Sequence, residues 1–187
     1  MEFWLETIFI AKGVQIAYFR GDPRNLLADM VLAKPTIFIT VPRVLGRIHA
    51  GVTKNLREKT GVPGLMVSLA VTAKSAAYRR SGRVRSYWDF LVFDKIKEIL
   101  GGRVHMVATG SAPIAADVLY LFRIAFSVSV QEGYGMTEAV VTNIGSAGDQ
   151  QPYTVGPPLA NIELKLRDVP EKWDTPMQIS LAHEAKS

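Results

Sequence analysis

The twelve residues Ser127–Glu138 read Ser-Val-Ser-Val-Gln-Glu-Gly-Tyr-Gly-Met-Thr-Glu, and they decide the fold class that we expect. The first four residues, Ser127–Val130, come directly after a stretch with helical spacing, and they predict a short strand. The remaining eight, Gln131–Glu138, place two glycines around Tyr134 and end in a hydroxyl and a carboxylate. Because glycine punctuates turns, this part predicts a turn at the carboxyl end of the strand.

The same alternation of strand and helix patterns extends outward in both directions from this stretch. Apolar runs predict further strands at residues 14–19, 36–40, 104–108 and 162–166. Apolar residues at helical spacing predict helices at 2–12, between a cap at Asp22 and Pro35, and at 42–58, 65–80, 87–100 and 114–126. This order is typical of an α/β domain with a mostly parallel sheet flanked by helices. Ligands of such sheets sit beyond the carboxyl ends of strands, so the turns after 104–108 and 127–130 are the two candidate sites.

The first candidate turn reads Thr109-Gly-Ser-Ala-Pro113. Its small residues let the backbone approach a planar or anionic ligand closely. Ser111 is a candidate cap for the following helix, whose first N–H groups favour a nearby negative charge. Many strand-to-helix turns have this composition, so an ordinary turn explains the pattern at least as well.

The second candidate turn, Gln131–Glu138, offers three kinds of contact within five residues. The glycines beside Tyr134 leave room for a flat group to lie against its ring. Thr137 supplies a hydroxyl, and Glu138 supplies a carboxylate of the kind that Mg²⁺ prefers. This combination suits a nucleotide and its metal, and a plain turn with a partly buried tyrosine explains it about equally well.

Length and composition narrow the class of protein. The chain has 187 residues, which fits one domain, and it has no cysteine, which excludes a disulfide framework, a thiolate metal site and a cysteine nucleophile. The apolar start of the chain is interrupted by Glu2, Glu6 and Lys12, so no window reaches the ~20 apolar residues of a membrane span. The two glutamates also do not fit a signal peptide.

The net charge of +5 is partly local. Five basic residues fall within twelve positions: Lys74, Arg79, Arg80, Arg83 and Arg85. Such a run suits the phosphates of lipid headgroups, of a nucleotide or of nucleic acid, and a solvated helix end explains it as well. No aromatic RNA-binding module accompanies it, so nucleic acid is not among the expected partners.

Several common catalytic and metal patterns are missing from the sequence. The run Gly110–Ala112 is not the nucleophile elbow of serine hydrolases, and neither a dinucleotide-binding glycine pattern nor a P-loop is present. The three histidines, His49, His105 and His183, lie far apart, so no zinc site or metal cluster is predicted. His105 falls inside a predicted strand and is expected to be packed rather than to bind a ligand.

The hexapeptide Gly133–Glu138 resembles the Tyr-Gly-x-Thr-Glu motif of the acyl-adenylate-forming enzymes. Further segments resemble the long-chain acyl-CoA synthetase branch in the order of that family: Lys34–Phe38, Val41–Leu45, Gly101–Val104, Thr109–Ile114, Val155–Pro158 and Val169–Glu171. The resemblance covers residues 1–171 and implies a partial N-terminal domain of the adenylate-forming fold. Residues 172–187 are expected to form a divergent C-terminal tail.

The resemblance also implies a reaction, in which a fatty acid and ATP give acyl-AMP and pyrophosphate and the thiol of CoA then displaces AMP. It implies a fragment of an ATP-dependent, AMP-forming ligase, with ATP or AMP, Mg²⁺ and CoA as cofactors and substrates. The resemblance implies two catalytic residues, Thr137, which would hydrogen-bond the α-phosphate, and Glu138, which would help to hold Mg²⁺. It also implies that Tyr134 stacks on adenine. The implied nucleotide-binding residues are Gly110, Ser111, Ala112, Pro113, Glu132, Gly133, Tyr134, Gly135, Met136 and Thr137.

The pattern of the family is incomplete in this sequence. The loop that grips the ATP phosphates, the aspartate for the ribose hydroxyls and the C-terminal domain with its catalytic lysine are not found. We therefore expect little turnover from this chain alone, and the alternative is a non-catalytic product that binds adenylate weakly or serves as an interaction module. We expect a cytoplasmic or peripheral intracellular-membrane location. We also expect low solubility, because sheet edges and apolar faces would stay uncovered.

Overall fold

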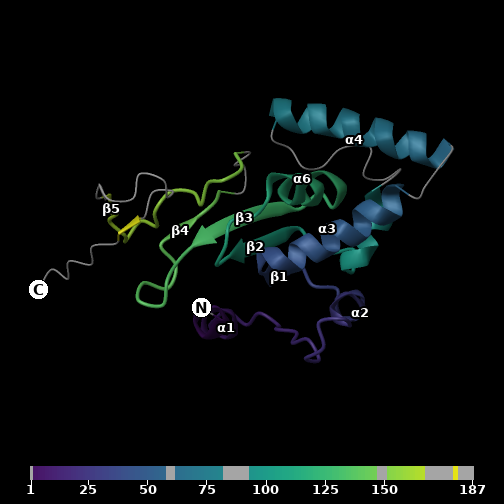
Figure 1. Cartoon of the computed structure of the whole chain (residues 1–187). Helices are drawn as coiled ribbons and strands as arrows, with labels where there is room; N and C mark the ends of the chain where they lie inside the picture. The colour runs from purple at the N-terminus through teal and green to yellow at the C-terminus, as the bar shows by residue number, and fades with distance from the viewer. Residues whose placement is uncertain (1, 58–61, 82–92, 147–150, 167–178, 181–187) are drawn as a thin grey trace, which may run out of the picture.

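The computed structural model describes residues 2–57, 62–81, 93–146, 151–166 and 179–180 (Figure 1). Its helices are α1 (Glu2–Ala11), α2 (Leu26–Ala33), α3 (Pro42–Arg57), α4 (Val62–Ser81), α5 (Asp94–Lys97), the 3₁₀ turn η2 (Glu98–Leu100) and α6 (Ala116–Ala125). Its strands are β1 (Ile37–Thr40), β2 (Met106–Gly110), β3 (Ser129–Tyr134), β4 (Asn143–Ile144), β5 (Lys165–Leu166) and β6 (Ile179–Ser180).

The four strands β1 to β4 form one sheet in the order β1-β2-β3-β4. The pairs β1–β2 and β2–β3 are parallel, and β4 is antiparallel to β3. A second pair, β5 with β6, is antiparallel. The predicted mostly parallel α/β architecture is therefore confirmed.

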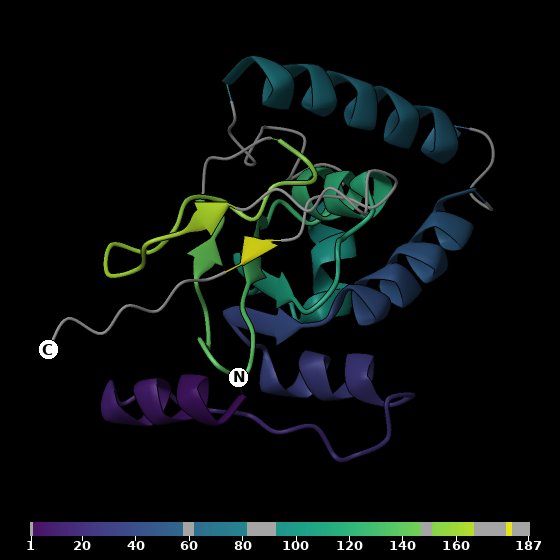
Figure 2. The ribbon, with the colours of Figure 1, turned by 60° about the vertical axis from the view of Figure 1, so that its left-hand side comes forward.

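Helices cover the sheet in layers. Helix α6 contacts β3, and α3 and α4 each contact α6. Both views show α6 between the sheet and α4, with α2 on the opposite side (Figures 1 and 2). Because α6 is covered on two sides, six of its residues are buried: Val118, Leu119, Phe122, Arg123, Ile124 and Ala125.

Apolar periodicity explains the core around α6. Helix α3 buries a stripe at helical spacing, consisting of Leu45, Ile48 and Val52. Helix α6 contributes Phe122, whose ring stacks on Phe126 with centroids 5.0 Å apart. The parallel strands place buried valines from both β2 and β3 in the same core. These packed elements fix the carboxyl ends of β2 and β3, where the candidate turns begin.

The predicted strand at 14–19 is wrong. This segment forms no regular element, and Val14, Tyr18 and Phe19 are 45%, 67% and 52% exposed. A strand needs a neighbour for its backbone hydrogen bonds, and none of the described strands pairs with this segment. Its end is instead tied to α2, because the guanidinium of Arg20 lies 2.6 Å from the carboxylate of Asp29.

Other predicted boundaries move by a few residues. Asp22 does not cap α2, because its carboxylate accepts from the N–H of Arg24 (2.9 Å) in a turn and the helix begins at Leu26. The strand predicted at 162–166 shrinks to Lys165–Leu166, whose length is set by pairing with β6. The helix predicted at 87–100 is described only from residue 93 and ends in η2, before the left-handed Gly101 (φ 83°). Residue 58 and residues 87–92 of the predicted helices lie outside the described residues.

Candidate adenylate-binding site

The two candidate turns adjoin each other at the carboxyl ends of β2 and β3. The parallel register pairs Thr109 with Glu132 and Gly110 with Gly133. The strands approach so closely here that a Cβ on Gly110 would lie 2.9 Å from the carbonyl oxygen of Gly133. The topology therefore brings together two segments that are separated in sequence by α6.

The backbone of the first turn has an unusual conformation directly after β2. Ser111 has a positive φ of 72°, and Ser111, Ala112 and Pro113 are all exposed. The prediction that Ser111 caps the next helix is wrong, because α6 begins at Ala116 after Ala115, without a side-chain cap. The exposed neighbours of Ser111 leave the turn accessible to a ligand.

Glu132 fastens the first turn to β3. Its carboxylate is buried and accepts a hydrogen bond from the backbone N–H of Ile114 (Oε1–N, 3.2 Å). Burial raises the pKa of Glu132, although the bond from Ile114 and the charge of Arg123 oppose that rise. Arg123 is itself buried and donates from Nη2 to the carbonyl oxygen of Val130 (3.3 Å). The sequence did not predict these contacts, because they join residues 18 and seven positions apart through the fold.

The strand β3 is longer than predicted and reaches Tyr134, so the second turn begins at Gly135 rather than at Gln131. The extension arises from β4, which pairs Gly133 with Ile144 and Tyr134 with Asn143. Thr142 donates its N–H to the carbonyl oxygen of Tyr134 (2.9 Å), and its single hydroxyl proton is shared between that oxygen (3.3 Å) and Oδ1 of Asn143 (3.0 Å). The backbone of Tyr134 is therefore fixed while its ring is partly exposed.

The second turn is compact and presents its polar groups to solvent. A Cβ on Gly135 would collide with the carbonyl oxygen of Val140, so only glycine fits there. The N–H of Ala139 bonds the carbonyl oxygen of Met136 (3.2 Å) and closes the turn, in which Thr137 and Glu138 are exposed. Their hydroxyl and carboxylate are thus accessible to a ligand.

Residues 142–146 and 151–159 contact the backbone beside the second turn. Buried Asn143 donates from Nδ2 to the carbonyl oxygen of Gly156 (3.0 Å) and accepts from the hydroxyl of Thr142 (3.0 Å). A Cβ on Gly156 would overlap the backbone of Ile144 and Gly145. Sequence reasoning missed Thr142 and Asn143, although the Val-Gly-Pro-Pro run from residue 155 marks their partner segment.

Two predictions outside the turns are wrong. Lys74 does not belong to a surface run, because it is 1% exposed, donates from Nζ to the hydroxyl of Ser127 (2.5 Å) and lies 4.6 Å from the ring centroid of Phe93. Arg80 is exposed, whereas residues 83 and 85 lie outside the described residues. His105 is exposed rather than packed, because β2 begins only after it, at Met106.

The site has one exposed carboxylate that could bind a metal ion, that of Glu138, because the carboxylate of Glu132 is buried and bonded to Ile114. Among the described residues, no group of three or more acidic, histidine or cysteine side chains is arranged to hold a metal. Mg²⁺ that is bound together with substrate phosphates needs only one or two protein carboxylates, so the residues present fit that kind of site.

Comparison with known proteins gives the class of this chain. The sequence pattern of the family described as AMP-binding enzyme matches residues 1–178. The chain belongs to the AMP-binding enzyme family.

Within that family, the chain is similar to long-chain acyl-CoA synthetases. It is 40% identical over 160 residues to the peroxisomal long chain acyl-CoA synthetase 7 of Arabidopsis thaliana, covering 85% of this chain and 23% of the relative. It is 40% identical over 168 residues to the long-chain-fatty-acid–CoA ligase 5 of Rattus norvegicus, covering 88% of this chain and 24% of the relative. The chain thus spans about a quarter of the length of these curated relatives.

Solved structures confirm the fold. The anthranilate CoA ligase AuaEII, in complex with anthranoyl-AMP, matches 83% of this chain and 23% of its own chain, with a TM-score of 0.54 and 21% identity. The A domain of a carboxylic acid reductase from Segniliparus rugosus, in complex with AMP and a co-purified carboxylic acid, matches 88% of this chain and 23% of its own, with a TM-score of 0.52 and 25% identity. The prediction of a partial adenylate-forming domain is confirmed.

Within the described ranges, none of the helices has both the length and the apolar character that crossing a bilayer requires.

Proposed function

We propose that this chain supplies the adenylate-binding part of an AMP-forming long-chain fatty acid–CoA ligase. The observation that carries the proposal is the pairing of Gly110 with Gly133, which sets the turn Gly110–Pro113 beside the segment Gly133–Glu138. Similarity to long-chain acyl-CoA synthetases supports the substrate class, a fatty acid with ATP and CoA. The cytoplasm or the surface of an intracellular membrane is the proposed location.

We assign the roles of the residues as follows. Tyr134 stacks on adenine, and the exposed first turn (Gly110, Ser111, Ala112 and Pro113) lines the base and the acyl-adenylate. Thr137 donates its hydroxyl to the α-phosphate. Glu132, Gly133, Gly135 and Met136 lie beside the nucleotide, and the two glycines give it clearance. The proposed domain covers residues 1–171, with 172–187 as a tail.

The chemistry follows from the charges that must meet. A fatty carboxylate has to approach a negatively charged α-phosphate, and donors placed around the phosphate offset the repulsion and stabilise the charge that develops. Glu138 would hold Mg²⁺ together with phosphate oxygens, and the ion when bound would neutralise part of the phosphate charge. No nucleophile from the protein is required, because the substrate carboxylate and then the CoA thiol perform the two attacks.

Calorimetric titration of the chain with a non-hydrolysable acyl-adenylate analogue tests the proposal. Tyr134→Ala should weaken binding about tenfold or more, because stacking of a base on an aromatic ring contributes about 1–3 kcal/mol. Tyr120→Ala and Glu163→Ala, which change exposed residues on α6 and before β5, serve as matched controls and should bind like the parent. If the parent, Tyr134→Ala and Glu138→Ala all bound the analogue with equal affinity, the proposed nucleotide site would be wrong.

A chain that binds adenylate without turnover is the second candidate, because two neighbouring turns can hold a nucleotide whether or not a reaction follows. Exchange of labelled pyrophosphate into ATP, with palmitate present, separates the two candidates. Exchange by the purified chain would establish catalysis, whereas binding without exchange would establish a binding module.

A further inference from the structure

The excess positive charge of this chain is concentrated in one segment. Residues 20–57 contain seven basic and two acidic residues, and the rest of the chain contains fifteen of each. The whole net charge of +5 therefore arises between Arg20 and Arg57. This segment includes α2, β1 and α3 and lies apart in sequence from the proposed adenylate site.

Helix α3 presents much of this charge along one line. It contains no acidic residue, and its exposed residues Arg43, Arg47 and Lys54 recur at i, i+4 and i+11, which places them on one side of a helix. We call these three residues the basic stripe. The buried residues of α3 occupy the opposite side, and they are Leu45, Ile48 and Val52.

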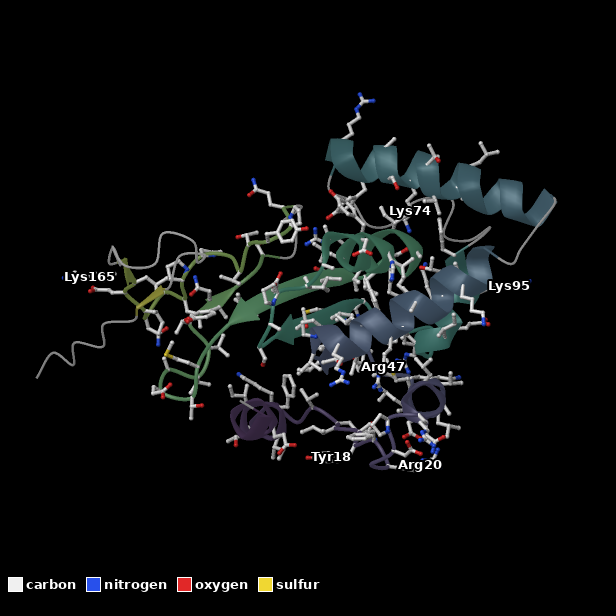
Figure 3. All side chains as sticks on the ribbon, viewed as in Figure 1. Tyr18, Arg20, Arg47, Lys74, Lys95 and Lys165 are labelled. Carbon is white, nitrogen blue, oxygen red and sulfur yellow. The ribbon has the colours of Figure 1, made fainter. Side chains whose placement is uncertain are left out.

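An apolar groove runs beside the basic stripe. It has a volume of about 200 Å³ and lies between α2, α3 and η2. Its apolar walls are formed by Leu26, Leu27, Val44, Ile48, Val52 and Ile99, and Arg24 and Arg47 also line it. Figure 3 shows Arg47 on the side of α3 that faces α2. Both arginines are exposed, so two guanidinium groups accompany an apolar groove.

The carboxylates of this segment offset only part of its charge. Asp29 forms an ion pair with Arg20 (2.6 Å), and Asp22, which accepts the backbone N–H of Arg24, is the only other acidic residue among residues 20–57. Helix α2 also carries exposed apolar side chains: Leu27, which lines the groove, is 37% exposed, and Val31 and Leu32 further along the helix are 45% and 77% exposed. An exposed basic helix beside exposed leucine and valine side chains is the pattern of a surface that meets both headgroups and acyl chains.

We propose that the basic stripe and the α2–α3 groove form a docking surface for a bilayer that contains anionic phospholipid. The arginines contact lipid phosphates, and Leu27 and its exposed neighbours on α2 enter the headgroup boundary. The groove favours lipid over nucleic acid, because its apolar walls match an acyl chain and offer no partner to a hydrated sugar-phosphate backbone. This surface differs from the predicted run at residues 74–85, in which Lys74 is buried.

Vesicle flotation of the 187-residue chain tests this surface and also separates binding from aggregation, because aggregates do not float. Vesicles of phosphatidylcholine with about one third phosphatidylserine should carry the chain to the top of a density gradient, and pure phosphatidylcholine vesicles should not. Arg43→Gln with Arg47→Gln should lower the partition coefficient about 30-fold, because each basic residue near an anionic surface contributes about 1 kcal/mol. High salt should weaken binding of the parent by screening.

Two control variants separate the position of the charge from its amount. Arg80→Gln with Lys165→Gln removes the same charge from exposed positions on α4 and β5 and should float like the parent. Arg43→Lys with Arg47→Lys keeps the charge and should retain most binding. Equal loss in both glutamine pairs, or equal flotation with the two vesicle types, would overturn the proposal. So would retention of a short single-stranded RNA that depends on Arg43 and Arg47 while no vesicle binding is found.

Discussion

At Glu132 a buried carboxylate holds the backbone of a neighbouring turn. Glu132→Ala would leave the N–H of Ile114 buried without its acceptor, and we expect this to lower the free energy of unfolding by about 1–3 kcal/mol. Glu132→Gln keeps an acceptor oxygen in place and should cost much less. Urea unfolding followed by circular dichroism measures both, with the exposed Glu163→Ala as control. Equal losses in Ala and Gln variants would contradict this role.

The same carboxylate should make stability depend on pH. Burial raises the pKa of Glu132 above its ordinary value of 4.5, so the folded state holds this proton at pH values where the unfolded chain has released it. The contribution of Glu132 is fully present below 4.5 and is lost as pH rises through the raised pKa. The free energy of unfolding of the parent relative to Glu132→Gln should therefore fall across that window. A difference that stays flat or rises with pH would show that the carboxylate does not titrate as inferred.

Gly135 tests whether the geometry of the second turn matters for binding. Gly135→Ala places a methyl group against the carbonyl oxygen of Val140, so the turn must shift, and both stability and adenylate affinity should fall. Gly46→Ala on α3 is the matched control, because nothing lies within 4 Å of its added Cβ. That control should stabilise the helix by about 0.5–1 kcal/mol. If Gly135→Ala bound the adenylate analogue as tightly as the parent in the calorimetric titration, the geometry of this turn would not contribute to nucleotide binding.

At the scale of elements, Lys74 anchors α4 to the body of the protein. Lys74→Met keeps an unbranched apolar stem but removes the bond to Ser127 and the cation above Phe93, and it should destabilise the chain by about 1–3 kcal/mol. Amide hydrogen exchange should quicken in α4 before it quickens in β2 and β3. Arg80→Met on the same helix is exposed and should change the stability by less than about 0.5 kcal/mol.

The elements also show which features the sequence could predict. Periodicity predicted α3 and α6 because their apolar residues recur on one side, and the expected parallel sheet predicted that both candidate turns lie at the carboxyl ends of strands, whereas the structure shows that the two turns adjoin. The sequence pattern gave a wrong prediction at residues 14–19, whose apolar residues suit a strand but find no pairing partner among the described strands. It also failed at Lys74, whose burial depends on Ser127, 53 residues away. Contacts of that kind depend on the assembled fold and leave no local pattern.

At the scale of the whole molecule, the sheet has an edge that should govern the behaviour of the chain in solution. Among the described strands, β1 lies at the end of the sheet order. Ile39 in β1 and Val41 just after it are 43% and 46% exposed. An apolar edge strand with unpaired backbone groups is a template for association with another chain, so we expect self-association at micromolar concentration. Ile39→Lys should reduce it, because a charged side chain on an edge opposes pairing between strands. Sedimentation velocity measures the distribution of species, with Tyr120→Lys, an exposed change on α6, as control. Association that is unchanged by Ile39→Lys, or equally reduced by Tyr120→Lys, would show that the β1 edge is not the surface that associates.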